Sequence, residues 1–452
     1  MLEMSIDSRS RISIRPGLFA LLMLLGALAR VAGLPAHGSP DVIVFKIWSY
    51  AAAHGDPSRM YGTGNNWGPE FDVADARGEG SVVQYPPLAL YIFAASGRLY
   101  RAFFPAFPSG LPLTIMLKLT AILASALLTA LIWRVVSRRY GETTGRLAAI
   151  FYWANPAVIL LEGFLGYIDP WFALPAIAAV FAATEGAAVA SGVLLAAGLM
   201  IKPQAVFAGP AIVMALAAGR PWREWRPLLR AAVSGAATCL ALVWPVVHAH
   251  AFVNMLFALR GTISDGMLSG DAANLWWIAG DAIRPAARAE IVQMSSLLFA
   301  GRKILGHGAG GLVMVTTTWA ILVALMLSLM WHARRSMNLL TATGLTALVV
   351  HLYVVLGVQV HENHLFLAIP ALAIAAALDA RYRLFFAALT SIAFLNLNLF
   401  FGSGYGYTSA LRDHVHLVDL TVVLAAVNVA ALAWHFFAFL AVTRECRLLD
   451  GR

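Results

Sequence analysis

Long apolar runs separated by short polar breaks make up most of this chain. A helix needs about 20 apolar residues to cross a bilayer, so each run predicts a membrane-spanning helix. Three of the runs, between residues 171 and 219, are short for a full crossing and are also consistent with two longer, tilted helices. The twelve predicted spans are residues 17–34, 113–133, 147–163, 171–185, 188–201, 204–219, 231–248, 311–331, 338–358, 365–380, 384–401 and 417–441.

Composition supports the same fold class. Of the 452 residues, 60% are hydrophobic and only 12% are charged, and the mean hydropathy is +0.76. A soluble protein cannot bury so much apolar surface. We therefore expect an all-α polytopic membrane protein with about 12 transmembrane helices, forming a single integral-membrane domain over 1–452. The first run follows three arginines, and no small-residue cleavage site follows it, so we expect an uncleaved first span.

The basic residues predict an orientation. Six short segments that fall on one side of the twelve-span arrangement contain 18 of the 32 lysines and arginines. Such an excess marks the cytoplasmic side, so the net charge of +9 indicates topology rather than nucleic-acid binding. We expect a multi-pass protein of the cell (inner) membrane with both termini in the cytoplasm. The six segments are 1–16, 134–146, 220–230, 332–337, 381–383 and 442–452.

Two long loops, 35–112 and 249–310, then face outward. The first loop contains two aromatic and aliphatic stretches, 42–53 and 88–104. Both predict helices that lie in the membrane interface, where tryptophan and tyrosine are favoured. The second stretch is also long enough to be considered as a thirteenth span, but Arg98 and Arg101 lie within it and favour the interfacial position.

Polar residues from distant parts of the chain converge on this outward side. The densest group is the break at 359–364, which holds His361, Glu362 and His364 between two apolar runs. Ionisable groups are costly at a membrane helix end, so they indicate a functional site. An outward-facing active site would gather the following residues: Arg30, Asp41, Tyr85, Asp169, Lys202, Gln204, Asn274, His361, Glu362 and His364.

Simpler roles are open for several of these side chains. Asp41 and Asp169 each begin a predicted helix and are suitable as helix caps. Lys202 is suitably placed to extend its ammonium to the interface, and Trp276 to anchor there. His361 and His364 are three residues apart with no third strong ligand nearby, which makes a weak metal site. No glycine-rich phosphate loop or nucleotide fingerprint is present, which argues against a soluble nucleotide-dependent mechanism.

Several short motifs occur in a recognisable order along the chain. They are Asp41 with Phe45 and Trp48, Tyr85-Pro86-Pro87-Leu88, Asn155-Pro156, Glu162, Gly166-Tyr167-Ile168-Asp169, Lys202-Pro203-Gln204, Ala273-Asn274-Leu275-Trp276 and His361-Glu362-Asn363-His364. In this order, over roughly residues 20–380, the chain resembles the GT-C superfamily of membrane glycosyltransferases. It looks most similar to the dolichyl-phosphate-glucose glucosyltransferases of the N-glycan pathway and to bacterial relatives of the GPI mannosyltransferases. Two features depart from the N-glycan enzymes: an aliphatic Val42-Ile43-Val44 after the aspartate, and Asn363 where those enzymes have a lysine.

The resemblance implies a reaction and a set of partners. It implies an inverting hexosyltransferase that moves mannose or glucose from a polyprenyl-phosphate-sugar donor to a lipid-linked or cell-surface glycan acceptor, in contact with membrane lipids. Asp41 would be the catalytic base, and no metal or other cofactor is inferred, although the acidic residues of the first outward loop leave a metal possible. Arg30, Lys202, His361 and His364 would bind the donor phosphate, while Glu162, Asp169, Glu362, Tyr85, Gln204, Asn274 and Trp276 would bind sugar or acceptor.

A transporter or flippase of lipid-linked sugars is the alternative from another class. Transporters commonly show two related halves with sites near the bilayer midplane. Here the halves differ, and the polar residues gather at one surface, so the sequence favours an enzyme.

Overall fold

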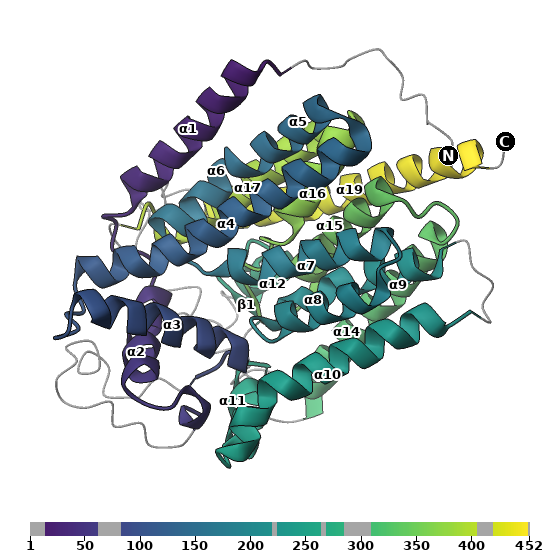
Figure 1. Cartoon of the computed structure of the whole chain (residues 1–452). Coiled ribbons are helices and arrows are strands. Elements are labelled where there is room, and N and C mark those ends of the chain that lie inside the picture. The colour runs from purple at the N-terminus through teal and green to yellow at the C-terminus, as the bar shows by residue number, and fades with distance from the viewer. Residues whose placement is uncertain are drawn as a thin grey trace.

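The computed structural model of this chain describes residues 14–61, 83–218, 224–263, 268–283, 309–404 and 419–450, and it is almost entirely helical (Figure 1). Most of the basic segment 1–16, the centre of the first outward loop and residues 284–308 of the second loop lie outside this range. The first half contains α1 (Pro16–Gly33), α2 (Asp41–His54), η2 (Pro57–Arg59), α3 (Pro87–Phe103), α4 (Leu111–Tyr140), α5 (Glu142–Trp153), α6 (Pro156–Ile159), the π-helical turn η3 (Leu160–Phe164), α7 (Asp169–Thr184), α8 (Ala188–Leu199), η4 (Pro203–Ala208) and α9 (Gly209–Ala217). The second half contains α10 (Arg226–His248), α11 (Phe252–Ile263), β1 (Ser269–Gly270), α12 (Leu275–Ile283), α14 (Ala309–Ala333), α15 (Leu339–Leu356), β2 (Val360–His361), α16 (Ala368–Leu378), α17 (Arg381–Phe401) and α19 (Leu420–Asp450).

Each of the twelve predicted spans is a helix or a helix pair. Within the described residues, seven helices are long and apolar enough to cross a membrane, namely α1, α4, α10, α14, α15, α17 and α19. An eighth span is formed if α5 and the α6–η3 segment, which meet at a 45° bend, are counted together. The remaining predicted spans are the shorter apolar helices α7, α8, η4–α9 and α16. The chain is therefore an all-α polytopic membrane protein.

The bend between α5 and α6 follows from the sequence Asn155-Pro156. Proline lacks an N–H and is favoured at the first position of a helix, so α5 ends before it and α6 begins at it. The side chain of Asn155 caps the new helix by accepting from the backbone N–H of Ala157 at 2.9 Å. Its amide also donates to Thr390 of α17 at 2.9 Å, which fixes the direction of the bent pair.

Side-chain contacts bring several of the predicted cytoplasmic segments together. Arg139 at the end of α4 pairs with Glu185 after α7 at 2.6 Å. Arg381 at the start of α17 pairs with Glu445 near the end of α19. These segments thus share one end of the bundle, as the charge pattern predicts, while the side of the membrane that they face stays a prediction.

The two predicted interfacial helices are present as α2 and α3, which pack against each other through aromatic rings. Trp48 of α2 lies edge-on to Tyr85 with ring centroids 5.3 Å apart, and Phe45 lies 5.2 Å from Phe93 of α3. The backbone N–H of Leu88 donates to the carbonyl of Met200 at 2.9 Å. The start of α3 is thereby held beside the segment that leads to Lys202.

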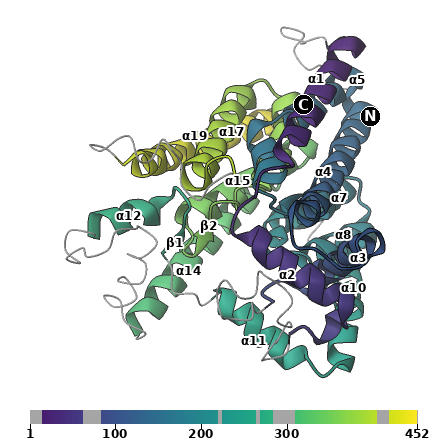
Figure 2. The ribbon, with the colours of Figure 1, turned by 90° about the vertical axis from the view of Figure 1, so that its left-hand side faces the viewer.

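The second outward loop contains more structure than the sequence indicates. It includes α11, α12 and a two-residue strand, β1, that pairs in parallel with β2 of the 359–364 break. Figure 2 shows α12 and β1 on one side of the molecule and α3, α8 and α10 on the other, with α2 between them. The loop is therefore placed to contribute to the same site as α2.

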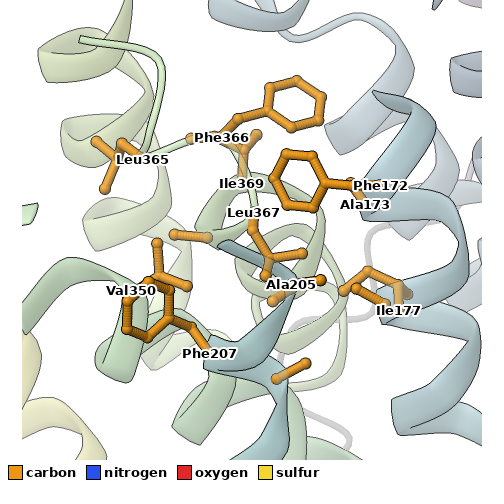
Figure 3. Close-up of a cluster of buried hydrophobic side chains, with 14 of the residues drawn as sticks. Phe172, Ala173, Ile177, Ala205, Phe207, Val350, Leu365, Phe366, Leu367 and Ile369 are labelled. Carbon is orange, nitrogen blue, oxygen red and sulfur yellow. The ribbon is translucent and has the colours of Figure 1, made fainter. Parts of the chain in front are cut away.

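Buried apolar side chains pack together between the helices (Figure 3). Phe172 and Ile177 of α7 meet Phe207 of η4 and Leu367 before α16, and all four are buried. Each of these elements also carries a polar candidate residue a few positions away. Packing of this core therefore brings the polar ends of three segments together.

Candidate active site

Asp169 and Lys202 form the buried centre of the candidate site. Asp169 begins α7, and Lys202 immediately precedes η4. The ammonium of Lys202 donates to Oδ1 of Asp169 at 2.9 Å, and the side chains are only 5% and 1% exposed. The amide of Asn363 donates to the other oxygen, Oδ2, at 3.1 Å. Both carboxylate oxygens of Asp169 are thus occupied.

Lys202 retains capacity to bind an anion. An ammonium has three N–H donors, and within the described residues the carboxylate of Asp169 takes one of them. The ring centroids of Tyr85 and Phe172 each lie 5.8 Å from the nitrogen, so both rings provide cation–π contact. A buried ammonium with donors to spare is suited to bind a ligand with oxygen acceptors.

Asp41 lies at the first residue of α2, where the chain enters the helix after Pro40. Its side chain is half-buried, and in the described part of the chain it accepts no hydrogen bond. Burial raises the pKa of Asp41, the charges of Lys202 and His361 oppose this, and the charge of Asp169 adds to it. The carboxylate is therefore within the field of the Lys202 ammonium and free to accept a proton.

The last four residues of the 359–364 break, called the 361–364 break below, supply the opposite wall of the site. Its backbone is fixed by the pairing of Val360 with Ser269 and by the Glu362 N–H, which donates to Gly270 at 3.1 Å. Gln359, just before it, has a φ of 61°, a left-handed conformation that is uncommon for a non-glycine residue. Such backbone outliers cluster at functional sites.

Glu362 and His364 of this break have different hydrogen-bond partners. Tyr167 donates to Glu362, and burial followed by the nearby charge of Asp41 raises the pKa of Glu362. His364 contacts Gln204 at 2.8 Å through Nε2 and Tyr353 at 2.9 Å through Nδ1. Burial, together with the charges of His361 and Lys202, lowers the pKa of His364, which favours its neutral imidazole.

Tyr85 belongs to the same cluster. Its ring lies beside Lys202, and burial raises its pKa, as do the neighbouring charges of Asp41, Asp169 and Glu362. The sequence-predicted residues that the structure brings together are Asp41, Tyr85, Asp169, Lys202, Gln204, His361, Glu362 and His364.

Arg30 and Glu162 pair with each other rather than with Asp169 or Lys202. Arg30 donates to the carboxylate of Glu162, and both side chains are buried. Arg30 also donates to the carbonyl of Trp153 at 2.8 Å. The guanidinium also stacks on the Trp153 ring at 3.8 Å. This pair joins α1 to the bent segment, and the structure shows no contact between Arg30 and Asp41 or Lys202.

Asn274 and Trp276 also have structural contacts. Asn274 caps α12 by accepting from the Trp277 N–H at 2.9 Å, and its amide nitrogen is buried without a partner in the described structure. Trp276 donates to the carbonyl of Leu356 at 2.7 Å. Asn274 thus stabilises the start of α12, and Trp276 ties α12 to the end of α15, which leads into the 361–364 break.

The sequence analysis missed several buried polar residues within the spans. Asn396 of α17 accepts from the Ala273 N–H at 2.7 Å, and Asn428 of α19 donates to the Ala273 carbonyl at 2.8 Å. Lys118 of α4 contacts three carbonyls near α1 and η3. The signal that was available is the isolated polar residue in an apolar run, which is costly in a membrane unless it is used. Among the described residues, no group of three or more His, Cys, Asp or Glu side chains is arranged to hold a metal ion.

Comparison with known proteins yields little at the level of sequence. No family model matches this chain, and no curated protein sequence matches it. One solved structure that is similar to this chain is the crystal structure of ArnT from Cupriavidus metallidurans bound to undecaprenyl phosphate. The two share 13% identity, the match covers 96% of this chain and 78% of that one, and the TM-score is 0.47.

Proposed function

We propose that this protein is a GT-C membrane glycosyltransferase that transfers a hexose from a polyprenyl-phosphate-sugar donor to a hydroxyl of a lipid-linked or cell-surface glycan. The observation that carries this proposal is the placement of Asp41, an unpartnered carboxylate, in the field of Lys202, a buried ammonium with donors to spare. The order of motifs along the chain and the apolar surroundings suit a donor with an isoprenoid tail.

The reaction would be a single displacement. The acceptor oxygen attacks the anomeric carbon, the bond from that carbon to the phosphate oxygen breaks, and the acceptor proton passes to Asp41. General-base assistance of this kind contributes about 10²–10⁴-fold in rate. The products are the inverted glycoside and the polyprenyl phosphate.

The leaving phosphate gains negative charge as the bond breaks. Lys202 is the residue best placed to stabilise that charge, because one of its donors is held by Asp169 and the others are available. His361 is half-buried at the edge of the site and would add to the positive field. Glu362, Tyr85 and Gln204 would bind hydroxyl groups of sugar or acceptor.

The test is a transfer assay with purified protein in detergent. Short-chain polyprenyl-phosphate-glucose and polyprenyl-phosphate-mannose are supplied with a lipid-glycan extract, and wild type is compared with Asp41→Asn. We expect transfer from one donor, reduced about 10²–10⁴-fold by the substitution with little change in donor KM.

Asp56→Asn is a matched control, because Asp56 caps η2 on an exposed part of the same loop and its cap survives as an amide. It should transfer at the wild-type rate. Undiminished transfer by Asp41→Asn would remove Asp41 from the mechanism. A wild-type protein that transfers from neither donor would overturn the assignment as a hexosyltransferase.

A further inference from the structure

Lys118 is a buried charge that the proposed reaction does not use. It lies in α4, and its side chain is fully buried. Its ammonium donates to the carbonyls of Gly33 at 3.0 Å, Ala36 at 2.7 Å and Phe164 at 2.8 Å. Three donors meet three acceptors, and no carboxylate pairs with the ammonium in the described part of the chain.

The three carbonyls belong to the two segments that lead into the site. Gly33 ends α1, Ala36 lies in the turn that follows, and both precede Asp41, whereas Phe164 ends η3 and precedes Asp169. Lys118 therefore joins the two backbones a few residues before each of them presents its carboxylate.

The same two segments also contact each other directly. The Ser39 N–H donates to the Leu165 carbonyl at 2.8 Å. Gly166 has a φ of +76°, and a Cβ there would lie 2.7 Å from the side chain of Val42 and 3.4 Å from Cε of Lys118. Only a glycine allows this approach, so the segment after η3 packs directly on the lysine and on the residue that follows Asp41.

We propose that Lys118 is a positioning residue, whose three hydrogen bonds fix Asp41 relative to the Asp169–Lys202 pair. A lysine inside apolar helices is costly, and no neutral side chain brings three donors to one point. The catalytic consequence rests on the proposed function, but the positioning itself can be measured without any assay of sugar transfer.

Lys118→Met is the first variant, because methionine keeps much of the length and removes the donors. Leu128→Ala is its matched control, since Leu128 is fully buried on the same helix and its side chain has no hydrogen-bond donor to lose. Lys118→Arg is the second variant. Because arginine keeps the positive charge, this variant tests the proposal even if Lys118→Met fails to fold. Its planar guanidinium does not bring three donors to one point.

Two quantities are measured for each variant: amide hydrogen exchange over residues 34–40 and 164–168, and kcat and donor KM per folded molecule. We expect faster exchange at Ser39 in both Lys118 variants and not in Leu128→Ala. A displacement of about 1 Å costs on the order of 10²-fold in rate, so kcat should fall by about 10- to 100-fold in Lys118→Met with donor KM little changed.

Equal losses of kcat in Lys118→Met and Leu128→Ala would show that the lysine acts only on stability. Unchanged exchange at Ser39 in the Lys118 variants would overturn the proposal regardless of activity. If wild type transfers no hexose, the proposed function fails, and the exchange measurement still decides whether Lys118 fixes the two segments.

Discussion

Separation of the Lys202–Asp169 pair tests the centre of the site most directly. Lys202→Met leaves Asp169 buried with the amide of Asn363 as its remaining side-chain partner. Removing one member of a buried ion pair costs about 3–5 kcal/mol, because the other charge stays in a low-dielectric interior. Both side chains are at most 5% exposed, so solvent screening reduces this figure little.

The double variant Lys202→Met with Asp169→Asn separates stability from chemistry. Removing both charges avoids an uncompensated buried ion, so the double variant should recover most of the free energy of unfolding lost by Lys202→Met. Transfer should not recover, because a donor for the leaving phosphate is still missing. Losing such a donor lowers kcat by about 10²–10³-fold.

Two measurements are made on the same preparations. The free energy of unfolding is measured by SDS titration in detergent micelles with tryptophan fluorescence as the signal, and transfer is measured in a single turnover. Recovery of transfer in the double variant would refute the role given to Lys202, since its function would then be to neutralise Asp169. An unfolding free energy unchanged in Lys202→Met would show that the pair does not stabilise the fold.

The pH dependence of transfer should report on Asp41, because burial raises its pKa and a protonated base is inactive. As the pH decreases, the rate should therefore begin to fall at a pH above the ordinary aspartate pKa of about 3.9. His361→Ala removes a positive charge that lowers the pKa of Asp41, so it should move this fall in rate to higher pH. An unmoved pH profile would contradict the placement of His361. Asn428→Leu should lower the free energy of unfolding by about 1–3 kcal/mol for each buried group that it leaves unpaired, since Asn428 bonds both His351 at 3.0 Å and Ala273 at 2.8 Å. Asn398→Leu on α17, whose side chain makes no hydrogen bond within the described residues, is its control, and equal losses in the two variants would argue against that network.

The helices themselves were largely predictable from the sequence. Apolar runs of bilayer length leave few alternatives to helices, because the backbone has no other hydrogen-bond partners in lipid. The grouping of Asp41, Asp169 and Lys202 with the 361–364 break also followed, because an alternating path across the membrane places every second connection on the same side. The helices within the second outward loop did not follow, since α11 and α12 are short and lie among polar residues.

The pairing of side chains was less predictable. Arg30 was assigned to the site because it lies near the outward end of its span, and Glu162 because of the family resemblance. The 45° bend of the α5–α6 segment brings Glu162 beside α1, where it pairs with Arg30, whose guanidinium stacks on Trp153. A hydropathy pattern gives the depth of a residue but not the angle at which neighbouring helices meet, so depth alone did not show which charges are partners.

The buried polar residues of the spans explain how irregular loops are held at the end of the bundle that carries the candidate site. Ala36, Ser269 and Ala273 are all buried, so their backbone groups are removed from water and require partners within the protein. Lys118 supplies such partners to the segment before Asp41, and Asn396 and Asn428 supply them to the segment before α12. A side chain that satisfies a buried carbonyl also fixes its position. The same hydrogen bonds that make these loops tolerable inside a membrane protein therefore determine where Asp41 and the 361–364 break lie, and the spans act on the site through the loop backbone.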